Sequence, residues 1–173
     1  MNLIKKVVFS ASVVFFAGCS STALITTQKS LPVVYKDINA THEKKCDVSI
    51  SLFRLHNYTD TPRAGMRASN IIEGILLAKG YNVKNHLTDK LPSMKKARKI
   101  AKEDGSKYFM YGGVSEWRYK TGIDGEPAVS FQTSLYKTKN GALVWSATGS
   151  DSDWGNASIG STAQDLLTEM MAD

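Results

Sequence analysis

The strongest constraint on the fold comes from one stretch of the chain, "AVSFQTSLYKTKNGALVWSATGS", which spans residues 128–150. Apolar and polar residues alternate in two runs, and a period of two is typical of β-strands with one buried face. Between the runs lie Asn140 and Gly141, a dipeptide that favours the tight turn of a β-hairpin. The sequence therefore predicts an antiparallel hairpin in the second half of the chain, against which the other elements must pack.

Strand and helix patterns alternate in the first half of the chain. Residues 46–57 alternate in polarity and predict a strand. A helical stripe follows, in which Thr61 suits the N-cap, Pro62 suits the first helical position, and Gly80 marks the end. A further short strand is expected to begin at Tyr81.

A second helix is expected over residues 93–105, opened by a serine and closed by a glycine. A strand over residues 106–117 follows, and its glycine pair at 112–113 predicts either a bulge or a close packing contact. The last helix is expected to start near Ser161. The predicted order is β-α-β-α-β-β-β-α, and we expect an α+β fold in which helices cover one mixed sheet on one face.

The N-terminus has the features of a targeting signal. Residues 1–18 combine Lys5, Lys6, a short apolar run and small residues before Cys19, which predicts a lipoprotein signal peptide and a lipid on the cysteine. Ser20, in place of an aspartate, favours the outer membrane of a Gram-negative cell. The alternative is an ordinary secretory signal that happens to contain a cysteine.

The mature chain divides into two predicted parts. Residues 19–45 show no sustained periodicity and predict a lipidated tether, whereas residues 46–173 predict a single periplasmic domain large enough to bury a core. Once Cys19 carries lipid, Cys46 is the only free thiol, so no intrachain disulfide is expected. We expect Cys46 to act as a small buried residue of a strand.

Charge is distributed unevenly along the mature chain. Residues 19–112 carry 16 basic and 8 acidic side chains, whereas residues 113–173 carry 4 basic and 8 acidic ones. The asymmetry predicts separate charged faces, although a solvated surface with an uneven draw of charges explains it equally well. An exported protein rarely meets nucleic acid, so anionic lipid, lipopolysaccharide or water is the expected partner of the basic second helix. Its basic residues are Lys95, Lys96, Arg98, Lys99 and Lys102.

The chain carries no recognisable catalytic or metal-binding motif. His42, His56 and His86 lie far apart without metal-ligand spacing, so we expect surface or half-buried histidines and no cofactor. Asp124 and Glu126 resemble an acid–base pair, but no third catalytic group stands near them in the sequence. A non-enzymatic role is therefore expected.

Two polar stretches call for an explanation, "TGIDGEP" around Asp124 and "GSDSDWGNAS" around Trp154. An indole among serines and aspartates suits a membrane interface, where one edge is apolar and the N–H stays hydrated. The plainer interpretations are a glycine-bounded turn for Asp124 and a staple over the start of the last helix for Trp154. Trp117 and Trp145 lie in predicted strands and are expected to pack in the core or an interface.

Long motifs in both halves of the domain resemble one protein family. "NYTDTPRAGMRASNIIEGILLAKG" covers residues 57–80, and "SEWRYKTGIDGEPAVSFQTSLYKTKNGALVWSATGSDSDWGNAS" covers residues 115–158. Both resemble the PelC lipoproteins of Pel exopolysaccharide export. The resemblance extends from about Val48 to the C-terminus, so it includes nearly all of the predicted domain.

This resemblance implies a periplasmic subunit of a dodecameric ring, anchored in the outer membrane beneath the β-barrel exporter PelB. The implied fold is similar to the N-terminal domain of TolB and to other small periplasmic lipoproteins. The implied cargo is Pel, a cationic polysaccharide of the biofilm matrix. Asp124, with Glu126 beside it, would line the pore, and Trp154 would belong to a belt that contacts outer-membrane lipid. Arg118 is a candidate for pairing with a carboxylate of the Asp124 loop or across a subunit boundary.

Two other functions fit the sequence less closely. Similar folds occur in regulatory lipoproteins that activate a periplasmic cell-wall enzyme, and such an activator can work as a monomer. A polysaccharide-modifying enzyme would have to turn over soluble polymer. A closed ring distinguishes the export component from the activator.

Overall fold

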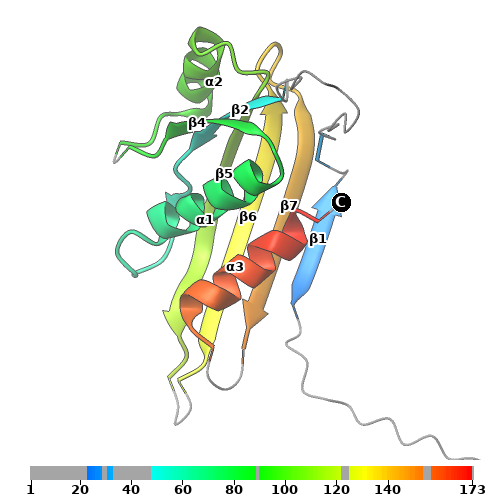
Figure 1. The fold of residues 1–173 in the computed structure, drawn as a ribbon. Helices are drawn as coiled ribbons and strands as arrows, with labels where there is room; N and C mark the ends of the chain where they lie inside the picture. Colours follow the sequence, from blue (N-terminus) through cyan, green and yellow to red (C-terminus); the bar gives the residue numbers. More distant parts are fainter. Residues whose placement is uncertain are drawn as a thin grey trace, which may run out of the picture.

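The computed structural model describes residues 23–28, 31–32, 48–88, 90–121, 125–153 and 157–172. This part of the chain forms one seven-stranded sheet and three helices (Figure 1). The strands are β1 (Leu24–Gln28), β2 (Ser49–Phe53), β3 (His56–Asn57), β4 (Asn82–His86), β5 (Tyr108–Tyr119), β6 (Pro127–Lys137) and β7 (Leu143–Ser152). The helices are α1 (Ala64–Ala78), α2 (Met94–Glu103) and α3 (Ile159–Met170).

The sheet is mixed, and its strand order is β1-β7-β6-β5-β2-β4, with β3 paired beside β5. β2 is parallel to β4 and β5, and β3 is parallel to β5. The pairs β5–β6, β6–β7 and β7–β1 are antiparallel. The α+β class and the predicted order of elements are confirmed, with β1 and the two-residue β3 as additions.

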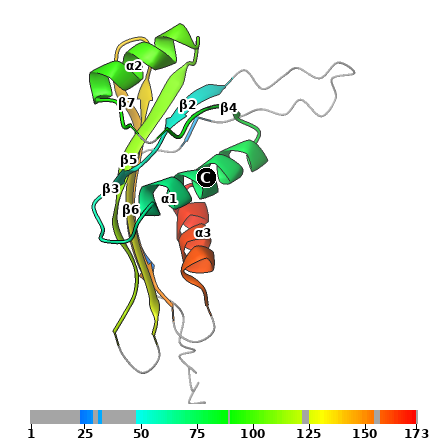
Figure 2. The same cartoon turned by 90° about the vertical axis from the view of Figure 1, so that its left-hand side faces the viewer.

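The helices cover both faces of the sheet, so the expectation of helices on one face was wrong (Figure 2). Ile50 and Leu52 of β2 join the larger core with α1 and α3, whereas Phe53 packs with Phe109 and α2 in a second cluster. The crossover through α1 leads from β2 to β4, its neighbour on one side. The crossover through α2 leads from β4 back past β2 to β5, the neighbour of β2 on the other side. Two right-handed crossovers in opposite directions put their helices on opposite faces.

The start of α1 differs from the predicted cap. Thr61 does not cap the helix, because its hydroxyl donates to the Trp117 carbonyl of β5 at 2.5 Å. Pro62 is not the first helical residue either, since the helix begins at Ala64 after Arg63, whose φ is 61°. A tertiary hydrogen bond to β5 has therefore taken the hydroxyl that the local pattern assigned to capping.

The other helix ends lie close to the predictions. Ser93 is the N-cap of α2, and Gly80 and Gly105 follow α1 and α2 with φ of 87° and 69°, as expected for glycines that end helices. α3 begins two residues earlier than predicted: Ser158 is its N-cap, and Ser161 is the third helical residue of a capping box. The sequence thus located all three helices and misplaced the starts of α1 and α3 by two residues each.

The hairpin of β6 and β7 is confirmed, but its turn is longer than the Asn-Gly pair suggested. Gly141 N–H donates to Lys137 O at 2.7 Å, and Lys137 N–H donates to Ala142 O at 2.8 Å. Gly141 has a φ of 77°, while Asn140 is not among the described residues with positive φ. A two-residue type I′ turn would need positive φ at both positions, so this is a wider turn closed by one glycine.

Of the two predictions for the glycine pair of β5, the close packing contact is confirmed, whereas the bulge lies just beyond the pair. The register of β5 against β6 shifts between Val114 and Glu116, which marks a bulge. A Cβ on Gly112 would collide with the Gln132 carbonyl, and one on Gly113 would lie 2.6 Å from the Tyr58 ring. Gly112 and Gly113 themselves pair regularly with Thr133 and Gln132, so the pair is required for close packing and not for the bulge.

One strand lies inside the range predicted as a tether. Leu24 pairs with Ser150 and Gln28 pairs with Ser146, so β1 extends the sheet beyond β7. Ile25 of β1 packs against the main core, and Leu31, soon after the strand, is 2 % exposed. The other residues of the predicted tether lie outside the described residues, apart from Ala23, Leu31 and Pro32. Cys46, which follows the tether, lies outside them as well.

Candidate functional site

The loop that carries Asp124 is closed at its base by two contacts between Lys120 and Glu126. Lys120 N–H donates to the Glu126 carbonyl at 2.6 Å, and Lys120 Nζ lies 3.1 Å from Glu126 Oε2. The Glu126 side chain is 13 % exposed and the Lys120 side chain 42 %. Glu126 therefore has a cation partner inside its own chain, while Asp124 lies outside the described residues.

Arg118 pairs with a carboxylate of its own strand, not with Glu126, the described carboxylate of the Asp124 loop. Its Nε donates to Glu116 Oε1 at 2.9 Å, two residues earlier on the same strand. The side chains of Arg118 and Glu116 are 59 % and 31 % exposed, so this is a surface pair. Pairing of Arg118 across a subunit boundary stays a prediction.

The second polar stretch lies directly beside the first. Asp153 N–H, after β7, donates to Pro127 O at 3.2 Å, and Ile159 N–H, at the start of α3, donates to the Tyr119 hydroxyl at 3.3 Å. Trp154 lies between these two contacts in sequence but outside the described residues. The ends of β5 and β7, which are separate in the sequence, thus lie together with the starts of β6 and α3 at one end of the sheet (Figure 1).

The first described strand starts at this same end. Leu24 pairs with Ser150, close to the end of β7, and β1 then runs away from the two loops (Figure 1). Cys19, the predicted lipidation site, lies outside the described residues but precedes Leu24 by only five positions. We call this end of the sheet, with the loops after β5 and β7 and the start of β1, the loop end.

Trp117 and Trp145 lie in the core, which confirms the first of the two predicted locations, core or interface. They are 3 % and 1 % exposed, and both belong to the main hydrophobic cluster. Trp117 meets Phe131 edge-on with ring centroids 6.1 Å apart. Trp117 Nε1 is buried without a hydrogen-bond partner in the described part of the chain.

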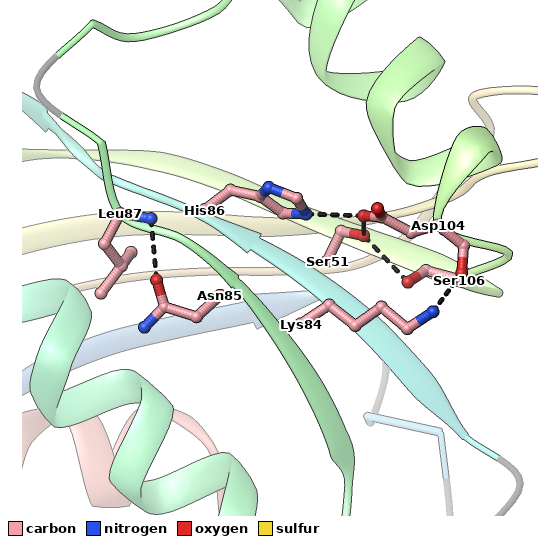
Figure 3. Close-up of polar contacts among 7 residues, drawn as sticks. All are labelled: Ser51, Lys84, Asn85, His86, Leu87, Asp104 and Ser106. Atoms are coloured by element: carbon pink, nitrogen blue, oxygen red, sulfur yellow. Dashed lines mark hydrogen bonds and ion pairs between the residues drawn. The ribbon is translucent and has the colours of Figure 1, made fainter.

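The structure also reveals a polar cluster that the sequence did not predict (Figure 3). His86 Nε2 lies 2.6 Å from Asp104 Oδ2, which also faces the Ser51 hydroxyl at 2.9 Å. Ser51 contacts Ser106, and Lys84 Nζ donates to the Asp104 carbonyl. The carboxylate lies between serine and histidine, so the Ser51 hydroxyl bonds to Asp104 and Ser106 and not to the imidazole. The cluster connects the end of α2 to β2 and β4. Because its residues come from three separate elements, no local sequence pattern predicts it.

His56 is likewise engaged in packing. Its Nε2 lies 2.6 Å from the Tyr111 hydroxyl, which donates to Pro92 O at 2.8 Å. Burial raises the pKa of Tyr111, with a smaller contribution from Tyr58, so the hydroxyl stays protonated at neutral pH. His42 lies outside the described residues, within which no group of three or more histidine, cysteine or carboxylate side chains could hold a metal ion.

Comparison with known proteins identifies the family. A PelC dodecamer from Paraburkholderia phytofirmans is 31 % identical, with a TM-score of 0.67 over 86 % of this chain and 94 % of that one. The chain belongs to the PelC family. A single-substitution variant of the same PelC, also a dodecamer, matches at 30 % identity and a TM-score of 0.68, over 86 % of this chain and 95 % of that one.

More distant structures share only the fold. Lipoprotein GNA1162 from Neisseria meningitidis is 21 % identical, with a TM-score of 0.54 over 70 % of this chain and 94 % of that one. Neither a protein-family model nor a curated protein sequence matches the chain. Within the described residues of this PelC homologue, no helix combines the length and apolar character needed to cross a bilayer.

Proposed function

We propose that this PelC homologue is a lipid-anchored, non-catalytic subunit of Pel exopolysaccharide export. Identical copies form a ring on the periplasmic face of the outer membrane, and the ring guides the cationic polymer to the β-barrel exporter PelB during production of the biofilm matrix. Membership of the PelC family supports this function, as does the dodecameric state of the two similar PelC structures.

The observation that carries the proposal is the position of β1. Cys19 precedes Leu24 by five residues, which can span at most about 17 Å even when fully extended. A lipid on Cys19 would therefore hold the loop end toward the bilayer. This orientation brings Trp154 to the membrane, where an indole is stabilised at the headgroup level.

The loop end also suits a cationic cargo. Because Glu126 is paired with Lys120, we expect Asp124 to provide the negative charge that faces the polymer. One exposed carboxylate attracts an amine by only about 1 kcal/mol in water. A ring repeats the charge around one opening, so many weak contacts gather the polymer and still let it slide.

Substitution of Asp124→Asn tests this function. We expect surface-exposed polymer to fall by about tenfold, because the collective potential of the ring is lost while each fold is intact. Asp60→Asn makes the same charge change on an exposed loop and is expected to leave export unchanged. Unchanged export in Asp124→Asn, with both variants assembled and membrane-bound, would contradict the proposed guide.

A further inference from the structure

A basic cleft lies at the opposite end of the sheet from the loop end. It has a volume of about 850 Å³ and lies between α2 and the turn after β6. All five basic residues of α2 line it, namely Lys95, Lys96, Arg98, Lys99 and Lys102. A second hollow shares Lys102 and adds Lys107, Lys137 and Lys139. None of the described residues that line the two hollows is acidic, so we treat the hollows as one surface, the α2 cleft.

Within the part of the chain that the structure describes, the basic side chains of α2 form one weak ion pair. Lys99 lies 3.8 Å from Glu103, and both side chains are highly exposed, at 77 % and 62 %. Such an exposed pair contributes little and exchanges readily for another partner. Lys95 and Lys102 are exposed and take part in no ion pair with any described residue. The α2 cleft is therefore prepared for an anionic ligand.

Arg98 gives the cleft a fixed shape. Its Nε donates to Thr138 O at 3.0 Å, and its Nη2 donates to Lys139 O at 2.6 Å. These bonds tie the turn after β6 to the middle of α2, while Ser93 caps the start of the helix. Since the two walls are held together before any ligand arrives, little ordering is needed on binding.

The cleft also offers apolar contacts. Met94 is 39 % exposed at the start of α2 and lines the cleft, and Phe109, which is 2 % exposed, lies beneath it in the core. Phe109 is stacked on Tyr136 with ring centroids 5.3 Å apart, so this wall is rigid. A ligand that fits would combine negative charges with at least one apolar group.

The spread of the charges favours a chain over a single anionic group. Lys95 and Lys102 are seven residues apart on one helix, which corresponds to about 10 Å. Lys137 and Lys139 continue the positive surface on the turn. One phosphate or headgroup would contact only a few of these cations, whereas an extended acidic segment would reach along the whole surface.

If the subunit has the orientation proposed above, with the loop end toward lipid, the α2 cleft lies far from the anchoring bilayer. β5 runs from beside α2 to the loop end over 12 residues, or about 40 Å. Screening at physiological salt has a length of about 8 Å, so headgroups at the loop end exert almost no attraction on α2. The partner must then approach from the periplasm.

We propose that the α2 cleft binds an acidic, extended polypeptide segment of a periplasmic partner protein. The carboxylates of that segment lie against Lys95, Lys99 and Lys102, and an apolar side chain packs on Met94. The contact couples the subunit to another component on the side away from the membrane.

The test measures peptide binding by the full lipidated protein in detergent micelles. The probe is a fluorescent peptide in which Glu and Phe alternate, and its reference has Gln in place of Glu. We expect the Glu peptide to bind at least about tenfold more tightly and to weaken with salt. Lys95→Glu/Lys102→Glu should raise its Kd about tenfold, and the neutral pair Lys95→Gln/Lys102→Gln should raise it by less.

The matched control is Arg63→Glu/Arg67→Glu, which makes the same charge change on exposed residues at the start of α1. We expect it to change the Kd less than about twofold. Equal loss in the control, or equal binding of both peptides, would overturn the proposal. A smaller ring in Lys95→Glu/Lys102→Glu would also overturn it, because the cleft would then be a subunit interface. The same holds if this variant loses binding to phosphatidylglycerol vesicles while its peptide binding is unchanged. Because no bilayer or polymer is present in the peptide assay, its failure is distinct from failure of the export function.

Discussion

At the scale of single residues, two glycines of α1 show how much a missing Cβ can matter. A Cβ on Gly65 would collide with the backbone carbonyl of Leu55, because α1 lies directly against the chain after β2. A Cβ on Gly74 would meet no atom within 4 Å. The same residue type in the same helix is therefore required at one position and unfavourable at the other.

These positions give opposite predictions for the same substitution. Gly65→Ala is expected to lower the free energy of unfolding by about 3 kcal/mol, because the obstacle is backbone and cannot rotate away. Gly74→Ala is expected to raise it by about 0.5–1 kcal/mol through the better helix propensity of alanine. Urea unfolding followed by circular dichroism measures both. A Gly65→Ala protein as stable as the parent would show that α1 can move off Leu55.

At the scale of elements, β1 has the largest consequence for function. It pairs with β7 and buries Ile25 against the core, so the chain is attached to the sheet only a few residues after Cys19. The predicted tether of residues 19–45 would have let the domain rotate freely above the membrane. A docked β1 instead restricts the proposed orientation to one with the loop end toward lipid.

Tryptophan fluorescence can test this orientation because the other two indoles are buried. Trp117 and Trp145 are 3 % and 1 % exposed, so quenching by brominated lipid should come almost entirely from Trp154. We expect quenching in vesicles with the lipidated protein, its loss in Trp154→Phe, and its retention in Trp145→Phe. Absence of quenching in the unsubstituted protein would exclude contact of Trp154 with the bilayer.

At the scale of the whole molecule, charge is segregated by the fold more than by the sequence. The α2 cleft gathers lysines from both halves of the chain, since Lys137 and Lys139 join the basic residues of α2. Carboxylates gather instead between β7 and α3. There, burial raises the pKa of Asp151 above 3.8. A hydrogen bond from the Ser152 backbone lowers this pKa, whereas the nearby carboxylates of Asp153, Glu169 and Asp165 raise it.

The raised pKa of Asp151 predicts a measurable pH dependence. The folded state holds this proton more tightly than the unfolded state, so the free energy of unfolding falls as the pH rises from 3.8 through the folded pKa. Asp151→Asn should flatten that slope and stabilise the protein at pH 7 by about 0.5 kcal/mol or less, because the side chain is partly solvated. Denaturant unfolding at several pH values measures this, with Asp60→Asn as the control. If the free energy of unfolding fell more steeply with pH in Asp151→Asn than in the parent protein, the pKa of Asp151 would be lowered by folding and not raised.

The sequence by itself determined the local elements and the family. The alternating runs around Asn140 and Gly141 gave the hairpin, and Ser93 and Gly80 marked helix ends, because these signals depend on residues a few positions apart. The long motifs around Asp124 and Trp154 carried the resemblance to PelC, which the structural comparison supports.

Only the tertiary structure decided which face each helix covers, that β1 joins the sheet, and that the ends of β5 and β7 lie together. Leu24 and Ser150 pair across most of the chain, and a five-residue edge strand is too short to show a clear period. The cluster of Ser51, His86 and Asp104 likewise joins β2, β4 and the end of α2. Such contacts are set by the topology of the sheet, which brings together residues that carry no local sign of one another.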